Sequence, residues 1–321
     1  MTQNKVKVKT DSIIRNIEQV ILGKSNEIKH VLAAFLAGGH VLLEDVPGTG
    51  KTMLAKALAR SFALTFSRVQ FTPDLLPSEL TGINFYSPKT GEFTFRKGSL
   101  FANIVLADEI NRATPRTQSG LLESMEERQI SVDGTTHSLE LPYFVIATQN
   151  PVETQGTFPL PEAQLDRFII QLNLGYPIRE ETINIIKNGT SANPLDNVTA
   201  VCTPSEWVEL QKNIADVFIN DDVYAYMTDL AEATRNHEAV SLGVSTRGII
   251  ALARIVKAYT AMEGRDFVNP VDIQQILPYV FSHRIMLKGG VRNRRRAVES
   301  LVEEVIATVA VPTEEWKGSK V

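Results

Sequence analysis

The chain has 321 residues, 43% of them hydrophobic and 22% charged, and carries a net charge of −4. This length suggests about two domains with a large buried core, and the composition is that of an ordinary globular protein. The slight acidity provides no positive field to attract nucleic acid or anionic membranes, so we expect no nucleic-acid partner.

The cysteine content and the distribution of apolar residues indicate where the protein is located and which structural sites it lacks. The one cysteine, Cys202, excludes an intramolecular disulfide and a cysteine-cluster metal site. The five histidines are scattered and give no metal-ligand set. The sequence shows no apolar signal core at its start and no apolar run of about eighteen residues. These features predict a cytoplasmic protein without a membrane span.

Two amphipathic helices are predicted between residues 11 and 36. Apolar residues recur there at helical spacing on either side of Gly23, which separates the two helices.

Residues 40–59 predict a strand, a glycine-rich turn and a helix. Gly48 and Gly50 let backbone N–H groups surround a phosphate, and the positive end of the following helix points at the same place. Lys51 can reach the β- and γ-phosphates, and the Thr52 hydroxyl can ligate Mg²⁺. This pattern is a P-loop. Its expected nucleotide-binding residues are Gly48, Thr49, Gly50, Lys51, Thr52 and Met53.

Asp45 occupies the position at which the usual P-loop motif has its first glycine. Aspartate tolerates unusual backbone angles better than most residues, so the loop can still form. A carboxylate close to a triphosphate is unfavourable, which predicts that this side chain points away.

The next segment predicts a strand over 66–71 and a proline-broken loop with one helical turn over 72–82. Residues 84–95 alternate like a hairpin around a Pro-Lys-Thr-Gly turn. The hairpin presents aromatic residues, which either pack against another part of the chain or form a contact surface.

The apolar run 103–109 predicts a buried strand that ends on two carboxylates. In an open α/β sheet the carboxyl end of such a strand lies beside the phosphates, where Asp108 can hold Mg²⁺ through water and Glu109 can orient the attacking water. This is a Walker B pattern. A helix over 115–125 and a second hairpin over 128–141, around Asp133-Gly134, follow it.

Two further polar positions follow buried strands. Residues 144–150 predict a strand that ends on Asn150, whose amide can hold the lytic water or the γ-phosphate; the alternative is that Asn150 only opens the turn before Pro151. A short helix over 160–168 delivers Asp166 and Arg167 in front of a strand over 168–174. The alternative there is an Asp-Arg pair at the surface.

From Gly175-Tyr176-Pro177 the composition shifts to helices, with loops near 188–204 and 240–245. We therefore predict two domains, 1–175 and 176–321. Arg247 lies in the first turn of a predicted helix, where the helix dipole destabilises a cation by about a few tenths of a kcal/mol. We therefore expect Arg247 to contact an anion. The alternative is an exposed arginine that tolerates its place.

A basic cluster near the C-terminus comprises Arg284, Lys288, Arg292, Arg294, Arg295 and Arg296. Such a cluster is usually a solvated face, and it could instead dock an acidic partner.

With these motifs located, the chain resembles the MoxR family of AAA+ ATPases, in the helix-2-insert group related to the ATPase subunit of magnesium chelatase. The resemblance runs from about residue 20 to residue 311. It is carried most specifically by the passages 71–78, 106–113, 147–151 and 160–168. Two departures are Lys97-Gly98-Ser99, where the family often has Gly-Pro, and Ser245-Thr246-Arg247, where it often has Ser-Pro-Arg.

The resemblance implies a fold and roles for several residues. It implies an α/β P-loop domain with a parallel sheet flanked by helices, followed by a smaller all-helical lid. Asn150 would be sensor 1, Arg167 the arginine finger offered to a neighbouring subunit, and Arg247 sensor 2. Residues near Ile21 and Gly23 would line the adenine pocket, and the two hairpins would be the insertions of the group.

The resemblance also implies function and partners. The first hypothesis is an ATPase that uses ATP and Mg²⁺ to remodel or activate a protein complex. We expect it to assemble as a homo-oligomeric, hexameric ring. A von Willebrand factor A domain protein is the expected partner in this family. A second is a chelatase-type ATPase that drives metal insertion. A third is a nucleotide-gated scaffold with little turnover. A helicase is least favoured by the acidic charge.

Overall fold

The computed structural model describes residues 2–89, 91–150, 156–189, 193–289 and 294–312. A five-stranded sheet in the order β2-β5-β8-β1-β9 forms its centre. All its pairings are parallel, which confirms the predicted α/β fold. The strands are β1 Val41–Glu44, β2 Phe66–Gln70, β5 Ile104–Asp108, β8 Phe144–Gln149 and β9 Ile170–Leu172.

Alternate side chains of the sheet enter two separate cores, as the two-residue period of a strand requires. Val41 and Leu43 belong to a first core with helices α1 (Thr2–Glu18), α2 (Ser25–Leu36) and α3 (Lys51–Ser61). Leu42 belongs to a second core with helix α5 (Pro115–Glu127). The helix predicted first begins earlier than expected, at Thr2.

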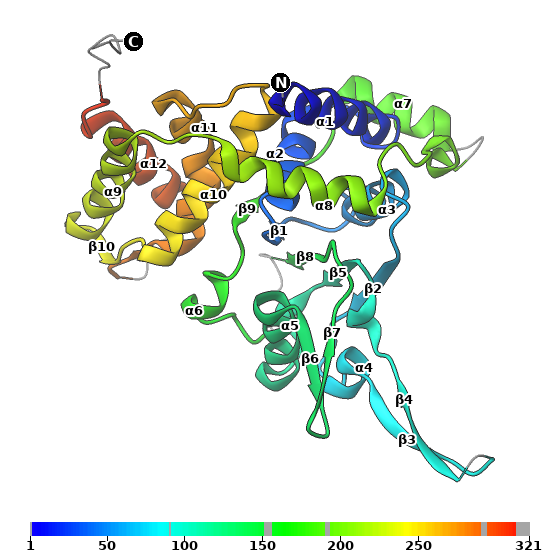
Figure 1. The fold of residues 1–321 in the computed structure, drawn as a ribbon. Coiled ribbons are helices and arrows are strands. Elements are labelled where there is room, and N and C mark those ends of the chain that lie inside the picture. The colour runs from blue at the N-terminus through cyan, green and yellow to red at the C-terminus, as the bar shows by residue number, and fades with distance from the viewer. Residues whose placement is uncertain (1, 90, 151–155, 190–192, 290–293, 313–321) are drawn as a thin grey trace.

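The chain leaves the sheet after β9 and returns to the helices of the first core. Helices α7 (Arg179–Gly189) and α8 (Pro204–Asn213) follow, and α8 runs across the front of Figure 1. Trp207 of α8 is fully buried, with its ring 5.0 Å from Phe35 and 4.7 Å from Phe62. We propose a domain boundary at residue 175, because the chain leaves the sheet there, after β9.

Four longer helices gather on one side of the sheet as the lid (Figure 1). They are α9 Asp221–Asn236, α10 Thr246–Met262, α11 Pro270–Phe281 and α12 Arg294–Thr308. The expectation of a purely helical lid with a loop at 240–245 was wrong in one detail: β10 (Val240–Leu242) pairs antiparallel with β11 (Met286–Leu287). Leu252, Ile255 and Val256 of α10 are buried in the first core, which fixes the lid against α1 and α2.

Both predicted hairpins are confirmed, and Figure 1 shows them extending from the body of the molecule. They are formed by β3 Ile83–Ser87 with β4 Glu92–Arg96 and by β6 Gln129–Val132 with β7 Thr135–Ser138. Phe95 stacks on His137 at 4.0 Å, so the two hairpins support each other.

The remaining elements are short. They are the helices α4 Pro77–Thr81 and α6 Glu162–Leu165 and the 3-10 turns Ser99–Phe101, Ile110–Arg112, Pro194–Asn197, Ile214–Asp216 and Ser282–Arg284. In the part of the chain that the structure describes, no helix is both long and apolar enough to cross a membrane.

Candidate active site

The glycine-rich loop joins the carboxyl end of β1 to the N-terminus of α3. Gly48 and Gly50 have φ of 87° and 92°, a backbone region that favours glycine. Gly50 precedes α3 and makes no side-chain cap, so the first-turn N–H groups of α3 are open to an anion. The Nζ atom of Lys51 donates to the carbonyl oxygen of Asp45 at 3.0 Å. The loop therefore has the form that a phosphate requires.

The carboxylate of Asp45 is turned away from this loop. One of its oxygens accepts hydrogen bonds from the N–H groups of Leu174 at 2.7 Å and Gly175 at 3.1 Å, just past β9. The side chain is 2% exposed. These hydrogen bonds hold the carboxylate towards the end of β9, which reduces its repulsion of a phosphate in the loop.

Asp108 ends β5 on the same face of the sheet as the phosphate loop. Its carboxylate accepts a hydrogen bond from the Thr148 hydroxyl at 2.7 Å and forms an ion pair with Arg68 at 2.6 Å. Sequence reasoning missed Arg68 and Thr148. A buried hydroxyl in an apolar strand was the available signal for Thr148, whereas nothing in the sequence marked Arg68.

Glu109 follows Asp108 in the left-handed region, with φ of 56°. Its N–H donates to the Thr148 hydroxyl at 2.9 Å. Its carboxylate accepts from Gln70 at 2.7 Å and from Arg112 at 3.0 Å. The carboxylate predicted to orient water is therefore held by two side chains, of which Gln70 lies on the edge strand β2.

Asn150 and Ile21 lie beside the loop, whereas Gly23 packs against α7. Asn150 is 6% exposed and follows β8, beside Asp45 in the sheet. Ile21 lies against the loop, since a Cβ at Gly50 would be 3.6 Å from its Cδ1 atom. Gly23 lies against Glu181, because a Cβ on Gly23 would overlap that carboxylate.

The donor set of this site fits a magnesium nucleotide. Mg²⁺ prefers hard oxygen ligands and is usually held by one or two protein groups plus phosphate. The Thr52 hydroxyl, at the start of α3, and the Asp108 carboxylate supply such oxygens. Neither is part of a larger group of His, Cys, Asp and Glu, as the described residues contain no such cluster of three or more.

Arg167 and Arg247 meet at the opposite, amino edge of the sheet. The two oxygens of Glu126 form ion pairs with Arg167 at 3.1 Å and with Arg247 at 3.0 Å. The Nε atom of Arg167 is buried and has no hydrogen-bond partner among the residues that the structure describes. The predicted finger and the predicted lid arginine thus lie together, although they come from different parts of the chain. Sequence reasoning missed Glu126, which carries no local signal.

The cavity around these arginines, about 260 Å³ in volume, is strongly positive. Its charged lining residues are Glu126, Arg128, Asp166, Arg167, Arg247, Arg254 and Arg284. Burial first, and then the neighbouring Arg128, lower the pKa of the Arg254 guanidinium. Five guanidinium groups against two carboxylates make this cavity a site for an anion.

Neither arginine can reach the phosphate loop of its own subunit in this arrangement. Gly38 and Gly39, which line the arginine cavity, precede β1, and the phosphate loop follows it. A strand of this length spans about 13 Å, which exceeds the reach of a side chain.

Asp166 does not pair with Arg167, so the alternative of a surface Asp-Arg pair was wrong. Its carboxylate binds Arg284 at 2.6 Å and the Ser245 hydroxyl at 2.9 Å. Arg284 is buried, and burial lowers the pKa of its guanidinium. It therefore fastens the lid to the sheet and does not belong to a solvated basic face, whereas Arg295 and Arg296 are exposed. Arg292 lies outside the described residues, as does the side chain of Arg294.

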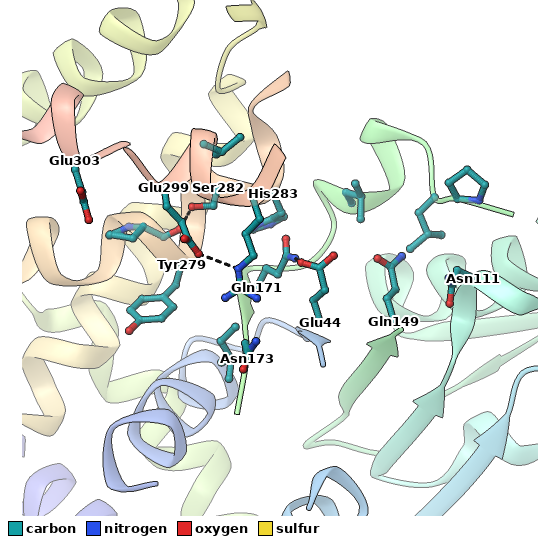
Figure 2. Close-up of a pocket in the computed structure, with 17 residues that line it drawn as sticks. Glu44, Asn111, Gln149, Gln171, Asn173, Tyr279, Ser282, His283, Glu299 and Glu303 are labelled. Atoms are coloured by element: carbon teal, nitrogen blue, oxygen red, sulfur yellow. Dashed lines mark hydrogen bonds and ion pairs between the residues drawn. The ribbon is translucent and has the colours of Figure 1, made fainter. Parts of the chain in front are cut away.

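A larger cavity of about 700 Å³ separates the sheet from the lid, and Figure 2 shows its lining. Glu44 and Gln149 line it from the carboxyl ends of β1 and β8, and His283 and Glu299 face them from the lid. Glu44 continues the Leu42 side of β1, which enters the second core. This cavity therefore lies on the other face of the sheet from Asp108.

Comparison with known proteins agrees with this architecture. Residues 40–170 match the family model described as ATPase family associated with various cellular activities (AAA), and residues 232–305 match that of the AAA lid domain. The chain is 46% identical to the Bacillus subtilis protein YeaC, with 94% of each chain covered. It is 36% identical to Chaperone MoxR1 of Mycobacterium tuberculosis, covering 93% of this chain and 81% of that one.

Two more relatives extend the comparison. Protein MoxR of Paracoccus denitrificans is 30% identical, covering 91% of this chain and 93% of that one. The crystal structure of a proposed ATPase from Cytophaga hutchinsonii superposes with a TM-score of 0.88 at 34% identity, with 97% of each chain covered. These relatives match the chain over nearly its whole length, through both the sheet and the lid, and the chain belongs to the MoxR family of AAA ATPases.

Proposed function

We propose that this protein hydrolyses ATP with Mg²⁺ as a ring of identical subunits and uses the cycle to remodel a protein client in the cytoplasm. The observation that carries the proposal is the placement of Arg167 and Arg247 on one carboxylate, at the edge of the sheet away from Lys51. A subunit of this shape offers its arginines to a neighbour and receives the neighbour's arginines at its own phosphate loop.

Different residues at the carboxyl edge of the sheet bind the nucleotide and promote its hydrolysis. Lys51 and the N–H groups of the glycine-rich loop bind the phosphates, and Asn150 positions the γ-phosphate or the water. Thr52 and Asp108 hold Mg²⁺, which when bound neutralises charge on the β- and γ-phosphates. Glu109, once released from Gln70, orients the water and accepts its proton.

The arginines complete this site from the next subunit. An arginine supplied in trans contributes about 10³ to 10⁵ in rate by stabilising charge in the transition state. The cavity around Arg167 and Arg247 has the positive charge that such a role needs. We propose a closed ring, because a heterologous contact repeated around an axis forms a ring where the rotation closes. Six subunits are the number that the family resemblance implies.

Two observations support the client side of the proposal. Chaperone MoxR1 carries a chaperone name, and the hairpin β3–β4 of this chain exposes Tyr86 and Phe93, the latter by 75%. Exposed aromatic groups on a projecting element suit contact with another protein. A client complex, with a von Willebrand factor A domain partner, is the corresponding proposal.

Mixing two inactive variants tests the trans arrangement. Lys51→Ala lacks the phosphate-binding lysine but still offers Arg167, whereas Arg167→Ala binds ATP but lacks the finger. Mixed rings should recover phosphate release that neither variant shows alone. The matched control mixes Lys51→Ala with a chain carrying both substitutions, and this mixture should stay inactive.

Two results would contradict the proposal. The first is a mixture that stays inactive although mixed rings are shown to form. The second is Arg167→Ala alone hydrolysing ATP at the wild-type rate. Absence of phosphate release from the wild-type protein, with ATP bound, would favour the nucleotide-gated scaffold.

A further inference from the structure

The backbone of Asp45 contacts two parts of the expected nucleotide site. Its N–H group donates to the carbonyl oxygen of Gln149 at 3.1 Å, immediately before Asn150. Its own carbonyl oxygen accepts from the Nζ atom of Lys51 at 3.0 Å. The residue therefore contacts the group expected to bind phosphate and the end of the strand that carries Asn150.

The side chain of Asp45 connects the same residue to the exit from the sheet. Its carboxylate accepts from the N–H groups of Leu174 at 2.7 Å, Gly175 at 3.1 Å and Val46 at 3.1 Å. Hydrogen bonds to a charged acceptor are about twice as strong as neutral ones. Leu174 and Gly175 begin the segment that leads from β9 to α7, and we call residues 174–176 the exit segment.

The exit segment also lies at the other end of the expected nucleotide site. The carbonyl oxygen of Tyr176 accepts from the Nζ atom of Lys24 at 3.2 Å. Lys24 follows Gly23, which lies against Glu181 of α7. The exit segment thus bridges the phosphate loop and the turn expected to line the adenine pocket.

The backbone of the loop does not demand aspartate or glycine at position 45. The described loop residues with φ in the left-handed region are Gly48 and Gly50. The backbone at position 45 therefore accepts a side chain, and the hydrogen bonds of the Asp45 side chain are made by its carboxylate.

We propose that Asp45 is a positioning residue that couples phosphate occupancy of the loop to the exit segment, and through it to α7, α8 and the lid. In the structure, the Nζ atom of Lys51 donates to the carbonyl oxygen of Asp45. When Lys51 turns to a phosphate, that oxygen loses its partner and the peptide after Asp45 is free to reorient. The carboxylate passes this change to the N–H groups of Leu174 and Gly175. The coupling rests on the proposed binding of ATP.

Amide hydrogen exchange of the full chain tests the coupling in the absence and presence of Mg²⁺ with ADP or a non-hydrolysable ATP analogue. The informative peptides cover residues 46–53 and 172–178. The variant is Asp45→Gly, which restores the usual P-loop glycine and removes the carboxylate. The control is Glu44→Gln, because Glu44 also joins β1 to β9, through Gln171 at 2.7 Å, but on the other face of the sheet.

In the nucleotide-free wild type, the amides of Leu174 and Gly175 should be protected, and nucleotide should change exchange in both peptides. In Asp45→Gly these amides should exchange about tenfold faster, since two bonds to a charged acceptor are lost. Nucleotide should still protect residues 46–53 of this variant but leave residues 172–178 unchanged. Glu44→Gln should behave like the wild type in both peptides.

The outcomes separate this inference from the proposed function. If nucleotide protects residues 46–53 of the wild type but leaves 172–178 unchanged, the coupling is overturned while nucleotide binding stands. The coupling is also overturned if Asp45→Gly shows the wild-type response in both peptides. If nucleotide changes neither peptide of the wild type, the proposed function fails and the coupling fails with it.

Discussion

The guanidinium of Arg68 forms an ion pair with the carboxylate of Asp108, with 2.6 Å between the two groups. Arg68 is a half-exposed residue of the edge strand β2, whereas Asp108 is nearly buried and ends the neighbouring strand β5. The arginine therefore places a positive charge beside the carboxylate expected to hold Mg²⁺.

Replacement of Arg68 should alter the magnesium requirement of nucleotide binding. A guanidinium and Mg²⁺ compete for the same carboxylate, so Arg68→Ala should lower the Mg²⁺ concentration at half-maximal nucleotide binding several-fold. Arg68→Lys keeps the charge and should stay close to the wild type. Titration of bound fluorescent ATP analogue with Mg²⁺ measures the effect. An identical midpoint in the alanine variant would show that Arg68 has no such role.

Glu109→Gln should bind ATP and stall. The amide keeps the shape of the side chain and its contact with Gln70, but it cannot accept a proton from water, and loss of a general base costs about 10²- to 10⁴-fold in rate. Glu123→Gln, on the exposed face of α5, is the matched control and should hydrolyse ATP normally. Turnover of Glu109→Gln within a few-fold of the wild type would refute the assigned role.

Arg247→Ala should slow hydrolysis while leaving stability nearly unchanged. Arg247 is half exposed, and an exposed ion pair such as that with Glu126 contributes about 0–1 kcal/mol. Its unfavourable position at the start of α10 offsets part of this contribution. The measurements are phosphate release and the free energy of unfolding. Unchanged turnover with a clearly lower stability would make Arg247 a structural residue.

Mixing also decides in which subunit Arg247 acts. If it serves the neighbour, Lys51→Ala rings mixed with Arg247→Ala should recover turnover, because each subunit lacks a different half of one site. If Arg247 serves its own phosphate loop, the mixture should stay as slow as Arg247→Ala alone.

Stability should fall as the pH falls below neutrality because of buried histidines. Burial lowers the pKa of His30 and of His40 to about 4 from 6.5, and burial places the pKa of His283 well below 6.5. The unfolded chain therefore binds more protons than the folded protein below pH 6.5. For His30 and His40, the contribution of the neutral ring is present above pH 6.5 and is lost towards pH 4, by about 2 kcal/mol for each residue between pH 7 and pH 5.

His40→Gln isolates one of these contributions. The ring of His40 accepts from the Val145 N–H and contacts the Met125 carbonyl oxygen, both at 3.0 Å, and a glutamine amide offers the same acceptor and donor without titrating. Denaturant unfolding at pH 7 and pH 5 should show a pH-dependent loss about 2 kcal/mol smaller in the variant. Equal losses in both proteins would exclude His40 as a source of the pH dependence.

Local sequence patterns were sufficient to predict the loop and the strand ends that form the carboxyl edge of the sheet. Gly48, Gly50 and Lys51 lie within one loop, and Asp108 with Glu109 ends one apolar strand, so each group is placed by its near neighbours in the chain. Parallel strands bring these ends to one edge, which explains why the fold class and the position of these residues at one edge of the sheet could be predicted together.

Only the tertiary structure decided which distant side chains meet. Arg167 precedes β9 and Arg247 begins α10, and their shared contact with Glu126 depends on how the lid packs on the amino edge of the sheet. The burial of Arg284 depends on the same packing. No local spacing encodes such contacts, because the positions of these groups are set by the two apolar cores to which their elements belong.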